Sequence, residues 1–240
     1  MLLAFTLSPA AAQQVPAGPF DMGRLHSNPD DGLVWVPHIL RDDRPVHTVT
    51  LDAFEINAHE VTNREFAKFV AAGEARPPYH WAADQPPKDK LDDPVANVTW
   101  HEADSYCRWA GKRLPTEAEW EKACRGGSSC AKYPWGEAEA DETRAHYDSV
   151  RGPKPVCSYE KNPYGLCDMA GNVWEWTADW YDRNYYESSP AENPKGPETG
   201  HYRMIRGGSW SDVPKFLTCA IRSYARPAER SPNIGFRCTK

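Results

Sequence analysis

The chain has 240 residues, enough for one large domain or two small ones, each with a core of its own. Lys and Arg total 28 against 34 Asp and Glu, and the net charge of −6 argues against a general nucleic-acid binder, which needs a basic surface. Ten Trp, 22 Pro and seven Cys, with a mean hydropathy of −0.73, exclude a coiled coil and favour a loop-rich fold held by aromatic side chains. No apolar stretch reaches the roughly 18–20 residues of a membrane span.

The first 13 residues, MLLAFTLSPAAAQ, resemble the end of a secretory signal. Residues 2–7 form an apolar run and residues 10–12 offer small side chains for cleavage, but no Lys or Arg precedes them. The alternative is a disordered tail. The cysteine count favours export, so we expect a periplasmic or secreted protein. We expect residues 1–14 to be a signal or tail and residues 15–240 to form one domain, because no linker divides the chain.

The predicted elements are few and short. Apolar runs predict strands at 46–51, 54–56, 95–98 and 204–205. Three capping-box patterns predict helix starts, each followed by apolar residues at helical spacing. They run from Thr62 to Glu65, from Thr99 to Glu102 and from Thr116 to Glu119. After residue 126 we expect loops and short strands, which gives an α+β domain with its helices early in the chain.

Several motifs together carry a family resemblance. They are GPFDMG at 18–23, EVTN at 60–63, GKRLPTEAEW at 111–120, YPWG at 133–136, NPYGL at 162–166, GNVWEW at 171–176, RGGSW at 206–210 and GFR at 235–237. In this order they resemble the formylglycine-generating enzyme family, also called the sulfatase-modifying-factor domain, over residues 15–240. The resemblance implies a variant of the C-type lectin fold with little regular secondary structure. The shared residues are mostly structural Gly and Trp, so they do not by themselves establish an activity.

The resemblance fails at the catalytic cysteines. Family members that make formylglycine oxidise a substrate cysteine with oxygen, using copper held by two cysteines shortly after the Gly-Gly-Ser motif. Two soft thiolates select Cu(I). Here Asp212 stands at the first cysteine position, the second has no counterpart, and the segment before Cys219 is shorter. Because a carboxylate is a hard ligand, we expect no copper and no formylglycine formation by that mechanism.

The cysteines are expected to serve the fold instead. The resemblance implies disulfides between Cys107 and Cys238 and between Cys124 and Cys219, each closing a long loop. Such closures contribute roughly 4–5 kcal/mol in the chain-entropy model. Cys157 and Cys167 flank a short loop and form a candidate third pair. Cys130 is then left over, either as a free thiol or as an intermolecular one.

A calcium site is the cofactor that the resemblance implies. Asp168 and Glu175 would supply side-chain ligands, and Gly171 and Val173 would supply carbonyls, because calcium prefers hard oxygen ligands. The alternative is that Glu175 pairs with an arginine. The family's second calcium site, near residues 146–148, is not carried over because the following loop is short. The eight His show no HxxxH or HExxH spacing, which disfavours an iron or zinc site.

The last third of the chain suggests a ligand cleft. Its arginines are Arg203, Arg206, Arg222, Arg226, Arg230 and Arg237. We expect a cleft for a peptide or small ligand lined by Ser209, Trp210, Asp212, Arg222 and Arg226. Arginine binds carboxylates through two hydrogen bonds, and tryptophan often contributes much of the binding energy. The alternative, preferred for Arg206 and Arg237, is a buried structural bridge.

Two functions stay open from the sequence. The first is an exported binding protein without the copper site, which we favour because no redox or nucleophilic constellation is recognisable. The second is a divergent oxidative maturation enzyme resembling the pyoverdine-maturation proteins. Neither the ligand nor the oligomeric state is predicted.

Overall fold

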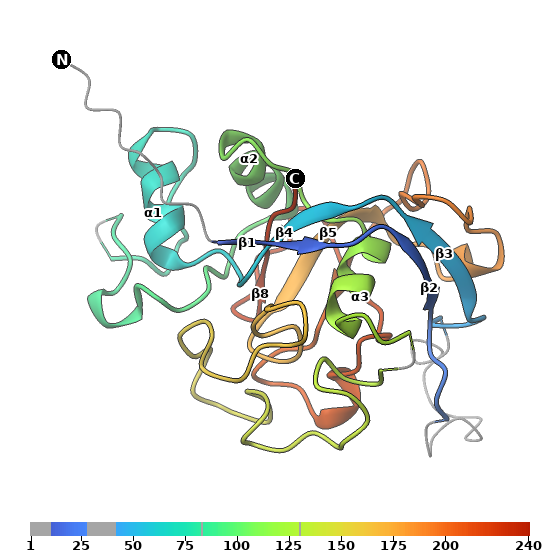
Figure 1. Cartoon of the computed structure of the whole chain (residues 1–240). Helices are drawn as coiled ribbons and strands as arrows, with labels where there is room; N and C mark the ends of the chain where they lie inside the picture. Colours follow the sequence, from blue (N-terminus) through green and yellow to red (C-terminus); the bar gives the residue numbers. More distant parts are fainter. Residues whose placement is uncertain (1–10, 28–41, 83, 130) are drawn as a thin grey trace.

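The computed structural model describes residues 11–27, 42–82, 84–129 and 131–240. Short elements alternate with long loops around a mixed core of helix and strand (Figure 1). The strands are β1 Ala12–Val15, β2 Gly18–Met22, β3 His47–Leu51, β4 Phe54–Asn57, β5 Trp174–Trp180, β6 Arg203–Arg206, β7 Ser223–Ala225 and β8 Ile234–Gly235. The α-helices are α1 Asn63–Ala71, α2 Trp100–Trp109 and α3 Glu117–Arg125, with 3-10 turns at Lys88–Lys90, Tyr185–Glu187 and Pro214–Phe216.

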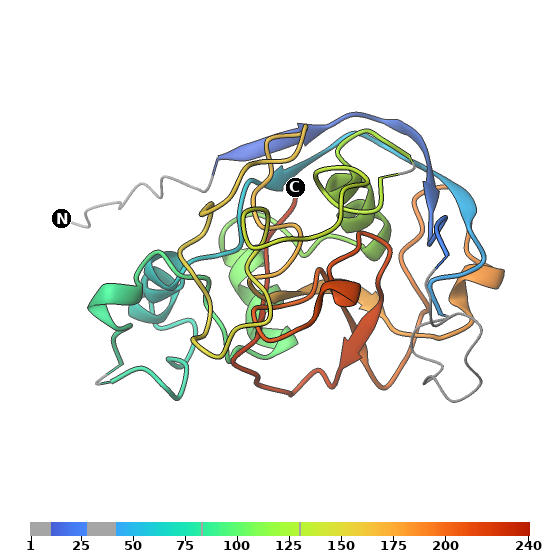
Figure 2. The same cartoon turned by 90° about the horizontal axis from the view of Figure 1, so that it is seen from below.

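The first four strands form one bent ribbon. β1 pairs antiparallel with β4, and β2 pairs antiparallel with β3. Figure 2 shows this ribbon arching over the outside of the molecule with α3 beneath it. Buried side chains along it, among them Val15, Phe20 and Ile56, pack in one cluster with Trp120 of α3. The ribbon therefore covers α3, all nine residues of which are buried.

All three helices begin at the expected capping boxes. Thr62, Thr99 and Thr116 each accept a hydrogen bond from the backbone N–H three residues on, and the Glu at that position returns one to the cap. This reciprocal bonding satisfies donors that a helix start otherwise leaves unpaired. The sequence prediction of these three starts is confirmed.

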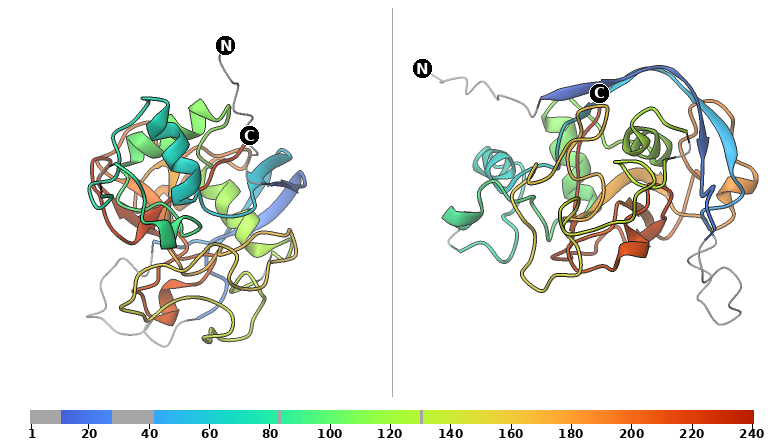
Figure 3. Two further views of the ribbon diagram at one scale, coloured as in Figure 1. Left: turned by 90° about the vertical axis from the view of Figure 1, so that its left-hand side faces the viewer. Right: turned by 60° about the horizontal axis from the view of Figure 1, so that its bottom comes forward.

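A second sheet has the order β7-β6-β5-β8. β5 and β6 are antiparallel, and β8 lies parallel to β5. Phe66, Tyr106, Trp176 and Phe236 belong to the cluster packed between this sheet and the helices α1 and α2. The views in Figure 3 show the loops between α3 and β5 running past both the ribbon and this sheet. The sheet carries the segments that build the candidate site.

Three disulfides cross-link the described chain, two between distant segments and one across a short loop. They join Cys107 to Cys238, Cys124 to Cys219, and Cys157 to Cys167, with S–S lengths of 1.96, 2.03 and 2.01 Å. These are the two pairs implied by the family resemblance and the candidate third pair. Cys130 lies outside the described residues.

Two expectations need correction. The domain start at residue 15 is too late, because Ala12–Val15 is already strand β1 and the Ala58 N–H bonds the Ala11 carbonyl; residues 1–10 lie outside the described part. The run at 95–98 is not a strand. Val95 and Val98 are apolar because both are fully buried, and Asn97 turns the chain with a φ of 60°. Nowhere in the described ranges is a helix long and apolar enough to cross a membrane.

Candidate functional site

The candidate site is built on the loop that leaves β6. Gly207 and Gly208 have φ values of 100° and 75°, and a Cβ atom at Gly208 would lie 2.6 Å from the Phe216 carbonyl oxygen. Only glycine fits such a conformation and approach without strain. The two glycines turn the chain into residues 209–212, here called the site loop.

Asp212 is held at the centre of the site loop. The buried Ser209 hydroxyl donates a hydrogen bond to the Asp212 carboxylate, and the Trp174 indole N–H donates to the same oxygen at 2.9 Å. The Asn233 amide donates to the Ser209 hydroxyl at 3.4 Å and to the Ser211 hydroxyl at 3.3 Å. The second Asp212 oxygen has no partner among the described residues. The loop therefore presents one fixed, unshared acceptor.

A pocket of about 430 Å³ adjoins the site loop. The backbone N–H groups of Asp148 and Ser149 bond the carbonyls of Asp212 and Trp210 at 2.9 and 2.7 Å, so the pocket wall and the loop form one unit. The pocket is lined by Glu142, Ala145, His146, Tyr147, Asp148, Ser149, Arg151, Lys154 and Tyr159. Of this lining the sequence pointed only to residues 146–148, the place of the family's second calcium site, which was not carried over. The other polar residues follow no motif, so the sequence did not identify them.

Apolar side chains surround the same loop. Val150 is 95% exposed and Val213 is 42% exposed, which is unusual for large aliphatic residues. Trp210 is half-buried, and its indole N–H donates to the Pro232 carbonyl at 3.3 Å. Trp210, Asp212 and Val213 are thus neighbours in the chain. Val150 follows Ser149, whose N–H bonds the Trp210 carbonyl.

Arg222 does not belong to this surface, and the expectation that it lines the cleft is wrong. Its side chain is buried, and its Nε donates to Glu117 at 2.7 Å while Nη1 donates to the Asp42 carbonyl at 2.7 Å. Burial opposes a charge there, but the Glu117 carboxylate keeps the pKa of Arg222 above its usual value. Arg226 is exposed, and its backbone N–H bonds Glu229 at 3.3 Å.

The other buried arginines also serve the fold. Arg206 contacts Glu117 at 3.2 Å and Glu121 at 2.5 Å. Burial opposes charge at Glu121, yet Arg125 and Arg206 hold its pKa below its usual range. Both terminal nitrogens of Arg206 are hydrogen-bonded, which offsets the cost of burying the charge, whereas losing one partner would leave an uncompensated charge. These arginine and glutamate side chains lie in the core, so they do not belong to the surface of the site loop.

The implied calcium ligands fit only in part. Glu175 is fully engaged: one oxygen accepts from Arg237 Nη2 at 2.7 Å, and the other accepts from Arg237 Nε at 2.7 Å and Trp120 Nε1 at 2.8 Å. Asp168 accepts from the Cys157 N–H at 2.6 Å.

Glu60, which the sequence did not single out, interacts with Asp168, and burial raises the pKa of both carboxyls. One Glu60 oxygen is buried without a partner among the described residues. The unpartnered Glu60 oxygen and the Asp168 carboxylate are oxygen donors that suit a hard cation. Glu175 does not belong to this donor set, because both of its oxygens accept hydrogen bonds from Arg237. Cys157 and Cys167 lie near Asp168 but offer no thiolate, because they form a disulfide.

The comparisons with known proteins agree with this architecture. A family model described as the sulfatase-modifying factor enzyme 1-like domain matches residues 6–240. The formylglycine-generating enzyme of Bos taurus is 34% identical over 289 residues, covering 96% of this chain and 74% of that protein. The solved structure of PvdO from Pseudomonas aeruginosa has a TM-score of 0.76 and 29% identity, covering 97% of this chain and 98% of that one.

A relative from Chlamydia caviae named serine/threonine-protein kinase pkn1 is 41% identical over 217 residues. The match covers 83% of this chain, but the chain spans only about a third of that relative, 35% of its length. The match to the family model and these identities show that the chain belongs to the sulfatase-modifying factor enzyme 1-like family, the family of the formylglycine-generating enzymes.

Proposed function

We propose that this chain is a ligand-binding member of its family, with a variant of the C-type lectin fold, and that its site loop binds an extended peptide without copper chemistry. The observation that carries the proposal is Asp212, which stands at a copper-ligand position and is fixed there as a hydrogen-bond acceptor. A carboxylate is a poor ligand for Cu(I) and a good acceptor for peptide N–H groups.

The state of the cysteines supports the same proposal. Six of the seven cysteines form disulfides, so the chain has at most one thiol. A copper site of the family type needs two thiolates. The disulfides also support an oxidising compartment, and with it a periplasmic or secreted location.

The chemistry around the loop favours a peptide. The free Asp212 oxygen can accept from a backbone N–H, while Trp210 and the exposed Val150 and Val213 can contact apolar side chains. Arg151 in the adjoining pocket can bind a ligand carboxylate, the role that was expected of Arg222. Aromatic and arginine side chains of this kind dominate peptide and protein binding sites.

The test is a selection of random linear peptides on the immobilised full chain, followed by affinity measurement of the enriched peptides. Asp212→Ala and Trp210→Ala should each weaken binding at least tenfold, which corresponds to about 1.4 kcal/mol. Lys88→Ala, in the distant 3-10 turn Lys88–Lys90, is the matched surface control and should leave the affinity unchanged. Enriched peptides that bind the Asp212 and Trp210 variants as well as the wild type would contradict the proposal.

The same preparation addresses the alternative of an oxidative maturation enzyme. Metal analysis of the purified chain should find no stoichiometric copper or iron. Either metal at one equivalent would favour the enzyme and sink the binding proposal.

A further inference from the structure

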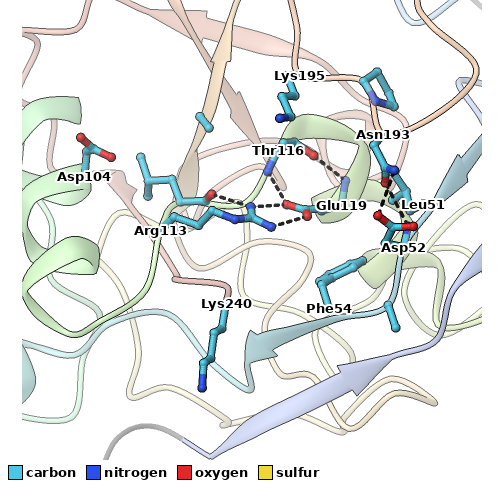
Figure 4. A pocket seen from close by; sticks show the side chains of 14 residues that line it. Leu51, Asp52, Phe54, Asp104, Arg113, Thr116, Glu119, Asn193, Lys195 and Lys240 are labelled. Carbon is cyan, nitrogen blue, oxygen red and sulfur yellow. Dashed lines mark hydrogen bonds and ion pairs between the residues drawn. The ribbon is translucent and has the colours of Figure 1, made fainter.

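A second and larger pocket lies at the other end of strand β5. It has a volume of about 560 Å³ and is built from the β3–β4 turn, residues 113–119, Ala178, residues 193–195 and Lys240 (Figure 4). Trp174 of β5 reaches the site loop, whereas Ala178, four residues on, lines this pocket, about 13 Å further along the strand. The two sites are therefore separate.

Arg113 offers an unused hydrogen-bonding edge in this pocket. Its Nη1 and Nη2 donate to the two Glu119 oxygens at 2.7 and 2.6 Å, and Nη1 also donates to the Leu114 carbonyl at 3.2 Å. Its Nε has no partner among the described residues, and the side chain is 46% exposed. The Nε and Nη2 edge of a guanidinium matches the two oxygens of a carboxylate.

The remaining uncompensated charge in the pocket is mainly positive. Lys195 and Lys240 are exposed, have no ion-pair partner in the described part of the chain, and lie on opposite sides of the Arg113–Glu119 pair (Figure 4). Two of the acidic groups are ion-paired, Glu119 with Arg113 and Asp104 with Arg108 at 2.8 Å, whereas Asp52 accepts a hydrogen bond from the neutral Asn193 amide at 3.1 Å and keeps its charge. An anion entering the pocket meets these cations without breaking an existing pair.

The carbon surface of the pocket limits the class of anion. Leu51, Phe54, Leu114, Ala178 and Pro194 supply apolar lining between the charged groups. A compact inorganic ion would leave this apolar lining exposed to water, whereas the carbon skeleton of an organic ligand would bury it. We propose that the pocket binds a small organic anion with more than one carboxylate, one carboxylate on the free Arg113 edge and another on Lys195 or Lys240.

The test is calorimetric titration of the full chain with citrate and with succinate at constant ionic strength. Saturable binding is expected for both, whereas succinamide, the uncharged counterpart, should not bind. The double variant Lys195→Ala/Lys240→Ala should weaken citrate binding at least tenfold. The variant Lys88→Ala/Lys161→Ala removes the same charge elsewhere and should bind citrate as the wild type does.

A further variant tests the guanidinium edge itself. Arg113→Lys keeps a cation beside Glu119 but loses the planar edge, and it should also weaken citrate binding, with an unchanged melting temperature as evidence of folding. Equal weakening in the Lys88/Lys161 control, equal binding of inorganic phosphate, or no saturable citrate binding would each overturn the proposal. None of these outcomes depends on peptide binding at the site loop.

Discussion

The arginines of this chain differ in role: some are buried and form ion pairs in the core, whereas others are exposed to solvent. Arg222 lies within the core on Glu117, while Arg226 four residues later is exposed. Arg222→Ala should destabilise the protein by about 3–5 kcal/mol, because it leaves the Glu117 carboxylate buried without one of its partners. Arg226→Ala should change stability by less than about 0.5 kcal/mol. Urea denaturation of both variants checks the contrast, and equal losses would contradict it.

The stability of the fold should depend on pH through Asp179. Burial first, and the Glu117 carboxylate second, raise the pKa of Asp179 from 3.8 to about 8. The folded state therefore keeps a proton that the unfolded state releases, so stability falls as pH rises between these two values. Each pKa unit corresponds to about 1.4 kcal/mol, so the loss amounts to a few kcal/mol.

Asp179→Asn tests this dependence, since Asn stays neutral and can still accept the bond from the Glu117 N–H. Its melting temperature should fall less than that of the wild type between about pH 6 and pH 9. A residual slope is expected from Asp42, whose pKa burial raises to about 6, and from Glu60 and Asp168, whose pKa values burial also raises. Identical pH profiles for the variant and the wild type would refute the assignment.

For single residues, the sequence predicts which chemical group stands at a position better than it predicts which groups the fold brings next to it. The sequence alone singles out Asp212, because it follows the Gly-Gly-Ser motif where the family resemblance places a copper-binding cysteine; this assignment stays a prediction. The burial of Arg222 could not be predicted, because Glu117 lies 105 positions away along the chain. The role of Glu60 was missed for the same reason, since only the fold brings it to Asp168.

Among the elements, the three capped helices and the apolar runs that form β3, β4 and β6 could be predicted from local signals, whereas β1 and β5 could not. The three helices begin where a Thr and a Glu three residues later cap each other. Strand β5 was not predicted, because it is formed by hydrogen bonds to β6 and β8, which come later in the chain. β1 was mistaken for part of a tail because its partner β4 lies about forty residues away.

The disulfides should differ in their contribution to stability. Cys107–Cys238 spans 131 residues and Cys157–Cys167 spans 10. In the chain-entropy model the first contributes about 5 kcal/mol and the second about 3 kcal/mol. The double variants Cys107→Ala/Cys238→Ala and Cys157→Ala/Cys167→Ala, compared by urea denaturation, check this order. A larger loss from the short pair would show that strain, rather than loop entropy, decides.

The loop that precedes β5 should respond to calcium. We propose that a bound ion would compensate Asp168 and the unpartnered Glu60 oxygen, so added calcium should raise the melting temperature. Glu60→Gln should reduce that increase, and Glu198→Gln, on an exposed loop, should not. If calcium leaves the wild type unchanged, the site is not a calcium site.

At the scale of the whole molecule, the family architecture carries a site loop for which we propose ligand binding without copper. The Gly207-Gly208 turn and the hydrogen bonds to Asp212 hold this loop in place, and Asp212 is a hydrogen-bond acceptor there. The fold could be recognised from its motifs, whereas the pocket beside the site loop depends on contacts between segments that share no motif.

The most direct measurement is mass spectrometry of a cysteine-containing sulfatase peptide incubated with the full chain, Cu(I) and oxygen. The peptide is expected to keep its cysteine, with the formylglycine-generating enzyme of Streptomyces coelicolor, a 34% identical relative, as the positive control. Multiple turnovers of cysteine to formylglycine by this chain would contradict the assignment of Asp212 and the binding function built on it.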